Sequence, residues 1–388
     1  MWHDRRILDL FGIDLPVLLA PMAGSGGSEL AIAVAEAGGL GSLPCAMLSL
    51  DQIRSELGVI RQRVKRPINL NFFCHRQPEP APGREEMWRR RLAPYYAEFG
   101  LDPNAAPAGA GRNPFNEEAC AIVEEHQPEI VSFHFGLPEE PLLERVRKTG
   151  AKIIASATTV AEARWLEERG CDAIIAQGAE AGGHRGIFLE DDISIQPGTM
   201  ALVPQVVDAV SAPVIAAGGI SDGRGIAAAF MLGASAVQIG TAYLQSPEAL
   251  TGPVHREALA NAREDRTVLT NVFTGRPARG LVNRIIREVG PICADAPAFP
   301  FATAAIMPLR KAAESMGFRR LLPALGRTGC PFGQTHAGAG IDHIHHEKRG
   351  GASEPLLTSG FSARVERRHR GWSHDSTGCK LLPICCSS

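Results

Sequence analysis

Residues 152–177 read KIIASATTVAEARWLEERGCDAIIAQ and contain one strand–helix–strand unit. Apolar residues run together at 152–157 and at 173–177, and a helix-like stretch at 160–169 separates the two runs. Because consecutive strands that are joined by a helical crossover pair in parallel, this unit predicts a parallel sheet covered by helices.

The same unit recurs on both sides of this stretch, which gives eight predicted strands. Eight such units fit a closed (β/α)8 TIM barrel, an α/β fold, and a doubly wound open sheet is the alternative. The predicted strands are 17–20, 40–43, 67–73, 130–135, 152–157, 173–177, 213–217 and 236–241.

Composition excludes several classes of protein. The chain has 388 residues, with 40 Lys and Arg against 42 Asp and Glu, for a net charge of −2. This balance argues against nucleic-acid binding, which needs a clustered positive surface. No apolar run approaches the roughly 20 residues that a membrane span needs. Nine irregularly spaced cysteines are typical of free thiols in a reducing compartment, so we expect a cytoplasmic protein. Its oligomeric state stays open.

Three segments depart from the repeat. Residues 74–114 are rich in Pro, Gly and Arg and contain one helix-like piece near 85–99, so we expect an excursion over the catalytic end of the barrel. We expect a barrel over 1–246, a small helical C-terminal cap or lid over 247–317, and an atypical tail over 318–388. For a helix after the first strand, Ser28 is the expected N-cap.

Polar and small residues gather at the predicted strand ends, where barrels of this type build their active sites. Gly218 and Gly219 follow one strand and Gly240 and Thr241 end the next, and this is the usual place of a phosphate cradle. A pair of tight turns is the alternative. The other candidates at strand ends or in the glycine-rich loop after 177 are Met22, Asn69, Asn71, His134, Gln177 and His184.

His134 is the expected proton acceptor. Strand alternation places Ser132, His134 and Gly136 on one face and Phe133 and Phe135 on the other. Imidazole titrates near neutral pH, although a histidine among aromatic residues is often purely structural. No set of His, Cys, Asp or Glu predicts a metal site; 343–346 and 385–386 contain such residues but lie in the atypical tail.

Four segments, at 20–24, 69–73, 132–136 and 176–186, together resemble the nitronate monooxygenase family, and the resemblance spans about 13–313. The family implies an FMN-dependent barrel that uses O2 to convert alkyl nitronates to carbonyl compounds and nitrite. It also implies His134 as the catalytic residue, which either takes a proton from a neutral nitroalkane or, when protonated, holds the nitronate. By the same resemblance, Met22 lies near the flavin ring. The residues expected to hold FMN are Asn69, Gln177, Gly182, Gly219, Gln238, Ile239, Gly240 and Thr241. From the residues themselves, Asn71, which has the same strand parity as Asn69, is an expected substrate contact, with a purely structural pair of the two amides as the alternative. His184 on the glycine-rich loop is a second candidate for the role of His134 or a substrate contact.

Two other functions stay open, namely an FMN- and NAD(P)H-dependent enoyl-acyl-carrier-protein reductase and a non-catalytic barrel that binds a flavin or phosphate ligand. The tail after about residue 317 departs from the family. We interpret it as disordered or translated out of frame, since a shift of one nucleotide would restore a segment similar to the family's own. A genuine metal-binding or basic extension is the alternative.

Overall fold

A computed structural model describes residues 2, 4–104, 112–262 and 267–316. The features discussed below lie within one compact unit, Asp4–Ile341. The predicted atypical tail, 318–388, lies outside the described residues.

Eight parallel strands form the barrel, in the order β1-β9-β8-β6-β5-β4-β3-β2. A parallel bridge between Leu18 and Leu40 joins the two ends of this sheet, so the closed barrel is confirmed and the open sheet is wrong. The strands are β1 Val17–Leu19, β2 Gly41–Pro44, β3 Ile68–Phe73, β4 Ile130–His134, β5 Lys152–Ala157, β6 Ala173–Gln177, β8 Val214–Ala217 and β9 Ala236–Ile239.

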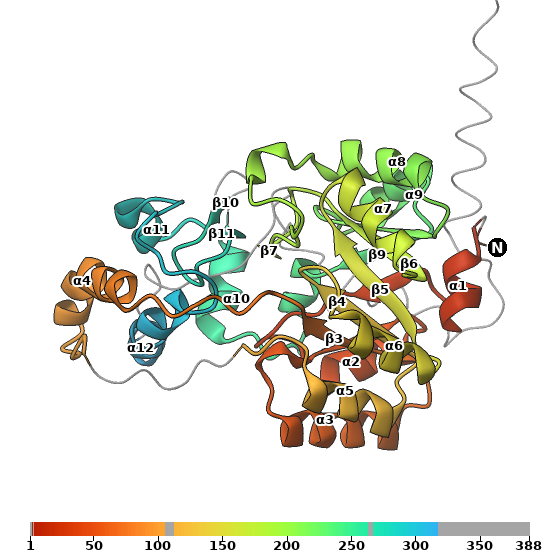
Figure 1. The fold of residues 1–388 in the computed structure, drawn as a ribbon, viewed down its shortest axis with the longest axis horizontal. Helices are drawn as coiled ribbons and strands as arrows, with labels where there is room; N and C mark the ends of the chain where they lie inside the picture. Colours follow the sequence, from red (N-terminus) through yellow and green to blue (C-terminus); the bar gives the residue numbers. More distant parts are fainter. Residues whose placement is uncertain (1, 3, 105–111, 263–266, 317–388) are drawn as a thin grey trace, which may run out of the picture. The chain divides into compact units, whose positions relative to one another are not determined.

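Helices surround the barrel strands (Figure 1). A short helix, α1 Arg6–Phe11, precedes the first strand. The helices between strands are α2 Ser28–Glu36, α3 Leu50–Arg63, α5 Glu117–His126, α6 Glu140–Lys148, α7 Val160–Glu168, α8 Thr199–Ala209 and α9 Gly223–Met231, with single 3-10 turns at η1 Cys45–Met47, η2 Ile193–Ile195 and η3 Thr241–Gln245.

Side-chain alternation along each strand decides what reaches the barrel interior. In β3, Ile68, Leu70 and Phe72 belong to the hydrophobic core that lies between strands and helices. Asn69 and Asn71 have the opposite parity and are also buried. Because burial of each large apolar side chain contributes about 1.5–3 kcal/mol, the apolar set fixes this register and directs the polar set inward.

The 74–114 insertion and the C-terminal segment share a second hydrophobic core. Helix α4, Pro82–Glu98, contributes Trp88 and Tyr96, which pack with residues of α11, Arg284–Val289, and α12, Ala302–Ser315. The indole of Trp88 donates to the carbonyl of Ala302 (3.3 Å), and the hydroxyl of Tyr96 donates to the carbonyl of Ala305 (2.7 Å). Figure 1 shows α4, α11 and α12 together beside the barrel. We call this group of elements the cap.

The cap also contains strands, so the expectation of a purely helical segment is incomplete. After α10, Pro253–Ala260, strands β10, Thr267–Thr270, and β11, Ala278–Leu281, form an antiparallel pair. Strand β11 pairs in turn with β7, Gly183–His184, which belongs to the loop after β6. This three-stranded sheet therefore attaches the cap to the candidate site.

One local prediction is wrong. Ser28 is the first residue of α2 and does not cap it; the N-cap is Gly27, whose side chain offers no oxygen. The carboxylate of Glu56 accepts a hydrogen bond from the Ser28 backbone N–H (2.8 Å) instead. A distant acidic side chain thus replaces the local cap that the sequence suggested.

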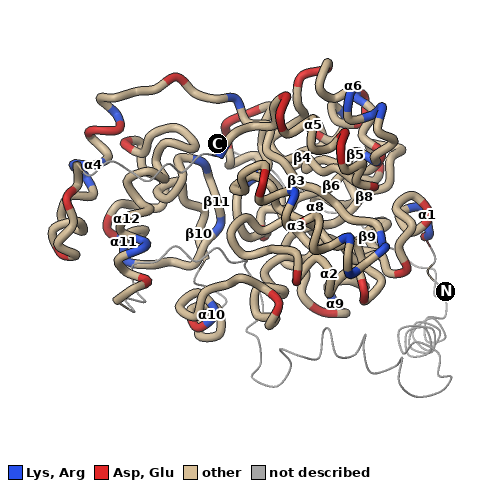
Figure 2. The backbone as a smooth tube through the Cα atoms, turned by 90° about the horizontal axis from the view of Figure 1, so that it is seen from below, with Lys and Arg blue, Asp and Glu red and all other residues tan. Residues whose placement is uncertain are grey.

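Charges on the described surface are mixed in sign. Figure 2 shows Lys and Arg interspersed with Asp and Glu around the barrel helices. Within the described residues, no helix combines the length and hydropathy that a membrane crossing would require.

Candidate active site

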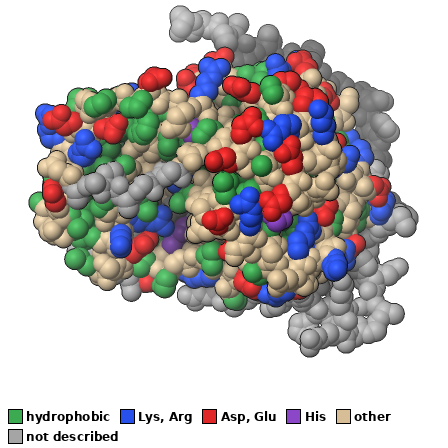
Figure 3. Space-filling model, turned by 60° about the horizontal axis from the view of Figure 1, so that its bottom comes forward, with side chains coloured by type: hydrophobic (Ala, Val, Ile, Leu, Met, Phe, Trp, Pro, Cys, Tyr) green, Lys and Arg blue, Asp and Glu red, His purple; other side chains and the backbone are tan. Residues whose placement is uncertain are grey.

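A cavity opens at the carboxyl ends of the barrel strands. Its space, including the open mouth, is about 1260 Å³. Figure 3 shows histidine side chains (purple) in a hollow on one face of the molecule. The sequence-predicted residues that line the cavity are Met22, Asn71, His134, Gln177, Gly182, His184, Gly219, Gln238, Gly240 and Thr241.

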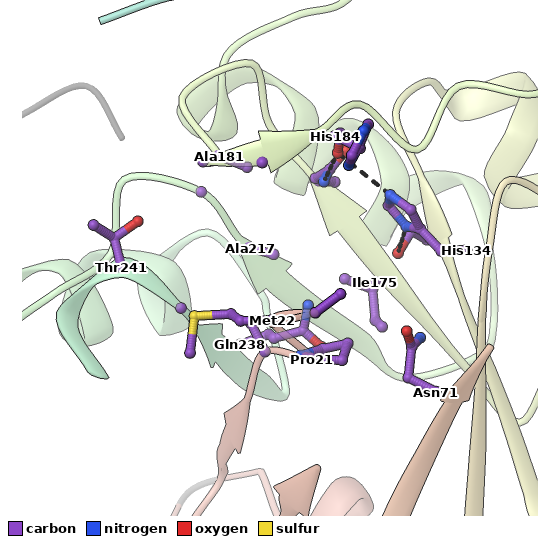
Figure 4. A pocket seen from close by; sticks show the side chains of 18 of the residues that line it. Pro21, Met22, Asn71, His134, Ile175, Ala181, His184, Ala217, Gln238 and Thr241 are labelled. Atoms are coloured by element: carbon purple, nitrogen blue, oxygen red, sulfur yellow. Dashed lines mark hydrogen bonds between the residues drawn. The ribbon is translucent and has the colours of Figure 1, made fainter. Parts of the chain in front are cut away.

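The histidines lie at one side of this cavity and Thr241 lies at the opposite side, with Met22 and Gln238 between them (Figure 4). The expected phosphate cradle and the expected catalytic group are therefore separated by the width of the cavity. This is the arrangement that an elongated cofactor requires if its two ends have different functions.

Both ring nitrogens of His134 have partners. Nδ1 lies 3.1 Å from the hydroxyl of Ser156, and Nε2 lies 3.3 Å from the backbone carbonyl of His184. Because a carbonyl oxygen only accepts hydrogen bonds, Nε2 carries the proton of the neutral ring, and Nδ1 accepts from the Ser156 hydroxyl. The lone pair of His134 thus points to a serine that itself lines the cavity.

The electrostatic environment keeps this histidine neutral. Burial, followed by the nearby charge of Arg276, lowers the pKa of His134 to about 3. Burial, followed by the charge of Arg112, also lowers the pKa of His184 well below its ordinary value. A neutral His134 retains a lone pair for accepting a proton, and its protonated role as the cation that holds a nitronate stays a prediction.

The loop after β6 is held by a buried network. The side chain of Arg185, which is fully buried, donates to the carbonyls of Gln177 and Gly178, both at 2.7 Å. The amide of Gln177 donates to the carbonyl of His184 (3.0 Å) and accepts from the N–H of Gly186 (2.8 Å). Both ends of the Gln177 side chain are thus paired with backbone, so this residue shapes the loop that contacts His134.

A glycine is required at position 186 because the backbone there lies very close to the side chains of His134 and Ser156. A Cβ at this position would lie 3.0 Å from Cε1 of His134 and 3.1 Å from Cβ of Ser156. The backbone of the loop therefore packs directly on the His134–Ser156 pair, and any side chain at 186 would push on it.

The rest of the cavity wall contains backbone turns at glycines and an unpaired polar atom. Gly218 and Gly219 have φ values of 120° and 70°, a region that favours glycine. Among the described residues, the buried Oε1 of Gln238 has no hydrogen-bond partner. A Cβ at Gly240 would lie 3.2 Å from that of Ala20 and 3.6 Å from the sulfur of Met22. These features fit a bound group that supplies hydrogen-bond donors and lies close to backbone.

The backbone N–H groups in the first turn of α9, the expected donors to a phosphate, are already hydrogen-bonded within the protein. The side chain of Asp222 accepts from the backbone N–H groups of Arg224 and Gly225. Since that carboxylate already caps the helix, an anion at this rim would rely on Gly218, Gly219 and the 240–241 turn.

Two predicted cofactor residues do not reach the cavity. The side chain of Asn69 donates to the hydroxyl of Ser42 (3.0 Å) and is absent from the lining residues, although its buried Oδ1 has no hydrogen-bond partner among the described residues. The side chain of Ile239 belongs to the core between strands and helices, because it has the opposite parity to Gln238. Phe135 also departs from the expected alternation: its φ of 72° turns the chain after β4, and its ring lies 4.9 Å from that of Phe73.

Sequence reasoning missed several polar groups that line the cavity, namely Ser25, Arg112, Ser156 and His255. Ser156 has the inward parity of β5, one residue before the strand ends, and this parity was the available signal. Arg112 lies at the end of the insertion, where no periodic pattern marks it. It is the one Lys or Arg among the described lining residues, which include no Asp or Glu.

Comparison with known proteins identifies the family. A sequence profile described as Nitronate monooxygenase matches residues 4–320. The chain belongs to the nitronate monooxygenase family. A nitronate monooxygenase of Pseudomonas aeruginosa is 41% identical over 315 residues, which cover 80% of this chain and 90% of that protein.

Solved structures place this nitronate monooxygenase family member among similar barrels. Nitroalkane oxidase from Streptomyces ansochromogenes superposes with a TM-score of 0.77 at 36% identity, covering 88% of this chain and 99% of that one. FabK from Thermotoga maritima has a TM-score of 0.62 at 27% identity and covers 95% and 99%. Because its relatives are a nitronate monooxygenase and a nitroalkane oxidase, the chain is an oxidoreductase of the monooxygenase type.

Proposed function

We propose that this protein is an FMN-dependent nitronate monooxygenase that converts alkyl nitronates and O2 to carbonyl compounds and nitrite. The observation that carries the proposal is the charge of the cavity wall. Arg112 and three histidines line it, two of which, His134 and His184, are kept neutral by burial, and no Asp or Glu lies among the described lining residues. A cavity of this kind favours an anion such as a nitronate over a cation.

The residues present fit FMN. Gly218, Gly219, Gly240 and Thr241 would hold its phosphate, and the unpaired oxygen of Gln238 would accept from the ring system beside Met22. Gly182 would allow the loop to approach it. When bound, FMN supplies the electron transfer between nitronate and oxygen, and the chain's own residues bind, orient and exclude water.

His134 and Ser156 are proposed to handle the proton when a neutral nitroalkane enters. The Ser156 hydroxyl lines the cavity and lies next to the lone pair of His134. It can therefore accept the substrate's Cα proton while passing its own proton to Nδ1. Because burial and Arg276 oppose a charged imidazole, this step is costly, and we expect the preformed nitronate to be the better substrate. His184 and Asn71, which also line the cavity, are proposed to contact the substrate.

The test is a visible absorption spectrum of the purified protein, recorded before and after anaerobic addition of ethyl nitronate. We expect a flavin spectrum that is bleached by the nitronate, and nitrite release once air is admitted. Bleaching by NADPH without nitrite formation would instead support the enoyl reductase alternative. A colourless protein that does not take up FMN would contradict the proposal.

A further inference from the structure

Arg112 carries a buried charge that is not matched by the protein groups described around it. Two of its nitrogens, Nε and Nη1, are buried without a hydrogen-bond partner among the described residues, and Nη2 reaches only the sulfur of Met47 at 3.8 Å. No ion pair joins Arg112 to a carboxylate within the described part of the chain. Burying an unpaired charge is unfavourable, so a complementary anion would stabilise this site considerably.

The surroundings of Arg112 are aromatic and cationic. The guanidinium carbon lies 5.5 Å from the centroid of the Phe299 ring, which in turn lies 5.4 Å from the ring of His184. The guanidinium of Arg276 lies 4.0 Å from the centroid of Phe135 and also has an unpartnered Nε. Arg276 also donates to the carbonyl of Ile187 and lies near the carboxylates of Asp191 and Glu162. The cation near these rings that lacks a carboxylate partner among the described residues is therefore Arg112.

His75 is another buried side chain beside Phe299. It is 4% exposed, and neither ring nitrogen has a hydrogen-bond partner among the described residues. Its ring packs edge-on against Phe299 at 4.7 Å. Burial, followed by the charge of Arg276, lowers the pKa of His75 to about 4, so the ring is uncharged at neutral pH, and an interaction with the Arg112 backbone opposes this shift.

We propose that Arg112 binds the negatively charged oxygens of the substrate and thereby selects the nitronate anion over the neutral nitroalkane. This inference rests on the proposed function and assigns to Arg112 the cationic role that neutral His134 does not fill. A planar guanidinium presents paired donors that match the two oxygens of a nitronate, whereas a lysine presents a single charged point.

The experiment compares Arg112→Met and Arg112→Lys with the unmodified full-length protein, each loaded with FMN. The control is Arg90→Met, because Arg90 is an exposed residue that pairs with Glu86 at 3.0 Å. Three quantities are measured: kcat and KM for ethyl nitronate, the dissociation constant of nitrate by calorimetry without substrate, and the dissociation constant of FMN.

We expect Arg112→Met to raise the nitronate KM and the nitrate dissociation constant about 30-fold, because a hydrogen-bonded charge pair is lost. Turnover number and FMN affinity should stay within about threefold, and Arg112→Lys should show an intermediate loss of roughly fivefold to tenfold. The control should match the unmodified protein.

Unchanged nitrate binding in the Met variant overturns the inference, and so does a parallel loss of FMN affinity, which would assign Arg112 to the flavin phosphate. If the Met variant does not fold, Arg112→Lys decides by the same criteria. Nitrate binding needs no turnover, so it tests Arg112 independently of the proposed function. If the unmodified protein does not oxidise nitronates, the proposed function is contradicted. If the Arg112 variants nevertheless lose nitrate affinity, the role of Arg112 in binding an anion still stands.

Discussion

Nε2 of the His134 ring lies 3.3 Å from the backbone carbonyl oxygen of His184, so the two histidines are joined ring to backbone. The side chain of Gln177 donates to the same carbonyl from 3.0 Å. This shared acceptor fixes which nitrogen of His134 carries the proton and leaves Nδ1 facing Ser156. The chemistry available to His134 therefore depends on the conformation of the loop after β6.

Replacing Ser156 with alanine should remove the donor at Nδ1 of His134. We expect kcat for a neutral nitroalkane to fall about 10-fold with little change in KM, because the proton path is lost while the cavity is kept. Ser156→Thr, which retains the hydroxyl, should restore most of the activity. An equal loss for preformed nitronate would contradict the proton-transfer role, since that substrate needs no deprotonation.

Replacing His134 with asparagine should decrease neutral nitroalkane turnover by at least about 100-fold, because the proton acceptor is removed. Nitronate turnover should fall much less, and the purified variant should keep its FMN absorbance. Nitrite formation from both substrates, measured side by side, is the readout. Wild-type turnover of nitroethane by this variant would exclude His134 as the base.

Acid should destabilise the protein through His75. Its folded-state pKa of about 4 is lower than the ordinary value of 6.5, so the unfolded chain takes up a proton at a higher pH than the folded one. Stability is therefore lost as pH falls from about 6.5 toward 4. His75→Phe keeps an aromatic ring and removes the titration, and we expect it to gain about 2 kcal/mol relative to the unmodified protein between pH 7.5 and pH 5. Urea unfolding midpoints of the variant and the unmodified protein at both pH values test this. A difference between the two proteins that is the same at pH 7.5 and at pH 5 would rule it out.

Replacing Arg185 with methionine should destabilise the folded state by about 3–5 kcal/mol, because the carbonyls of Gln177 and Gly178 would lose a buried charged donor. The exposed Arg84, which donates to the carbonyl of Ala294, provides a matched Arg84→Met control with an expected loss below about 1 kcal/mol. Denaturant unfolding measures both. Similar losses in the two variants would show that the network around Arg185 contributes little.

Replacing Gly218 with alanine should weaken both folding and FMN retention. The residue has a φ of +120°, and a Cβ would lie 2.7 Å from the hydroxyl of Thr199, so we expect a cost of about 1–3 kcal/mol. Gly223→Ala is the control, because a Cβ there meets nothing within 4 Å. Thermal unfolding with and without added FMN separates the two effects, and a Gly218→Ala protein with unchanged behaviour in both would contradict a cradle at this turn.

Local patterns were enough to predict the barrel and most of its rim. The parity of β4 places His134 inward, and the parity of β6 and β9 does the same for Gln177 and Gln238. The same parity, applied strictly, would have found Ser156 and would have excluded Ile239, which points to the helices. These features are predictable because alternation along a strand is a property of a few consecutive residues.

The sequence by itself determined eight parallel strands, the ends at which polar residues gather and the family to which the chain belongs, since each of these is written in short apolar runs and adjacent motifs. Only the tertiary structure decided that α4 of the insertion shares a core with the C-terminal helices, and that Arg112 and Phe299 meet beside His184. These groups lie far apart along the chain, and no local pattern encodes their contact. Their proximity follows from the packing of the cap, which depends on long-range burial of apolar side chains.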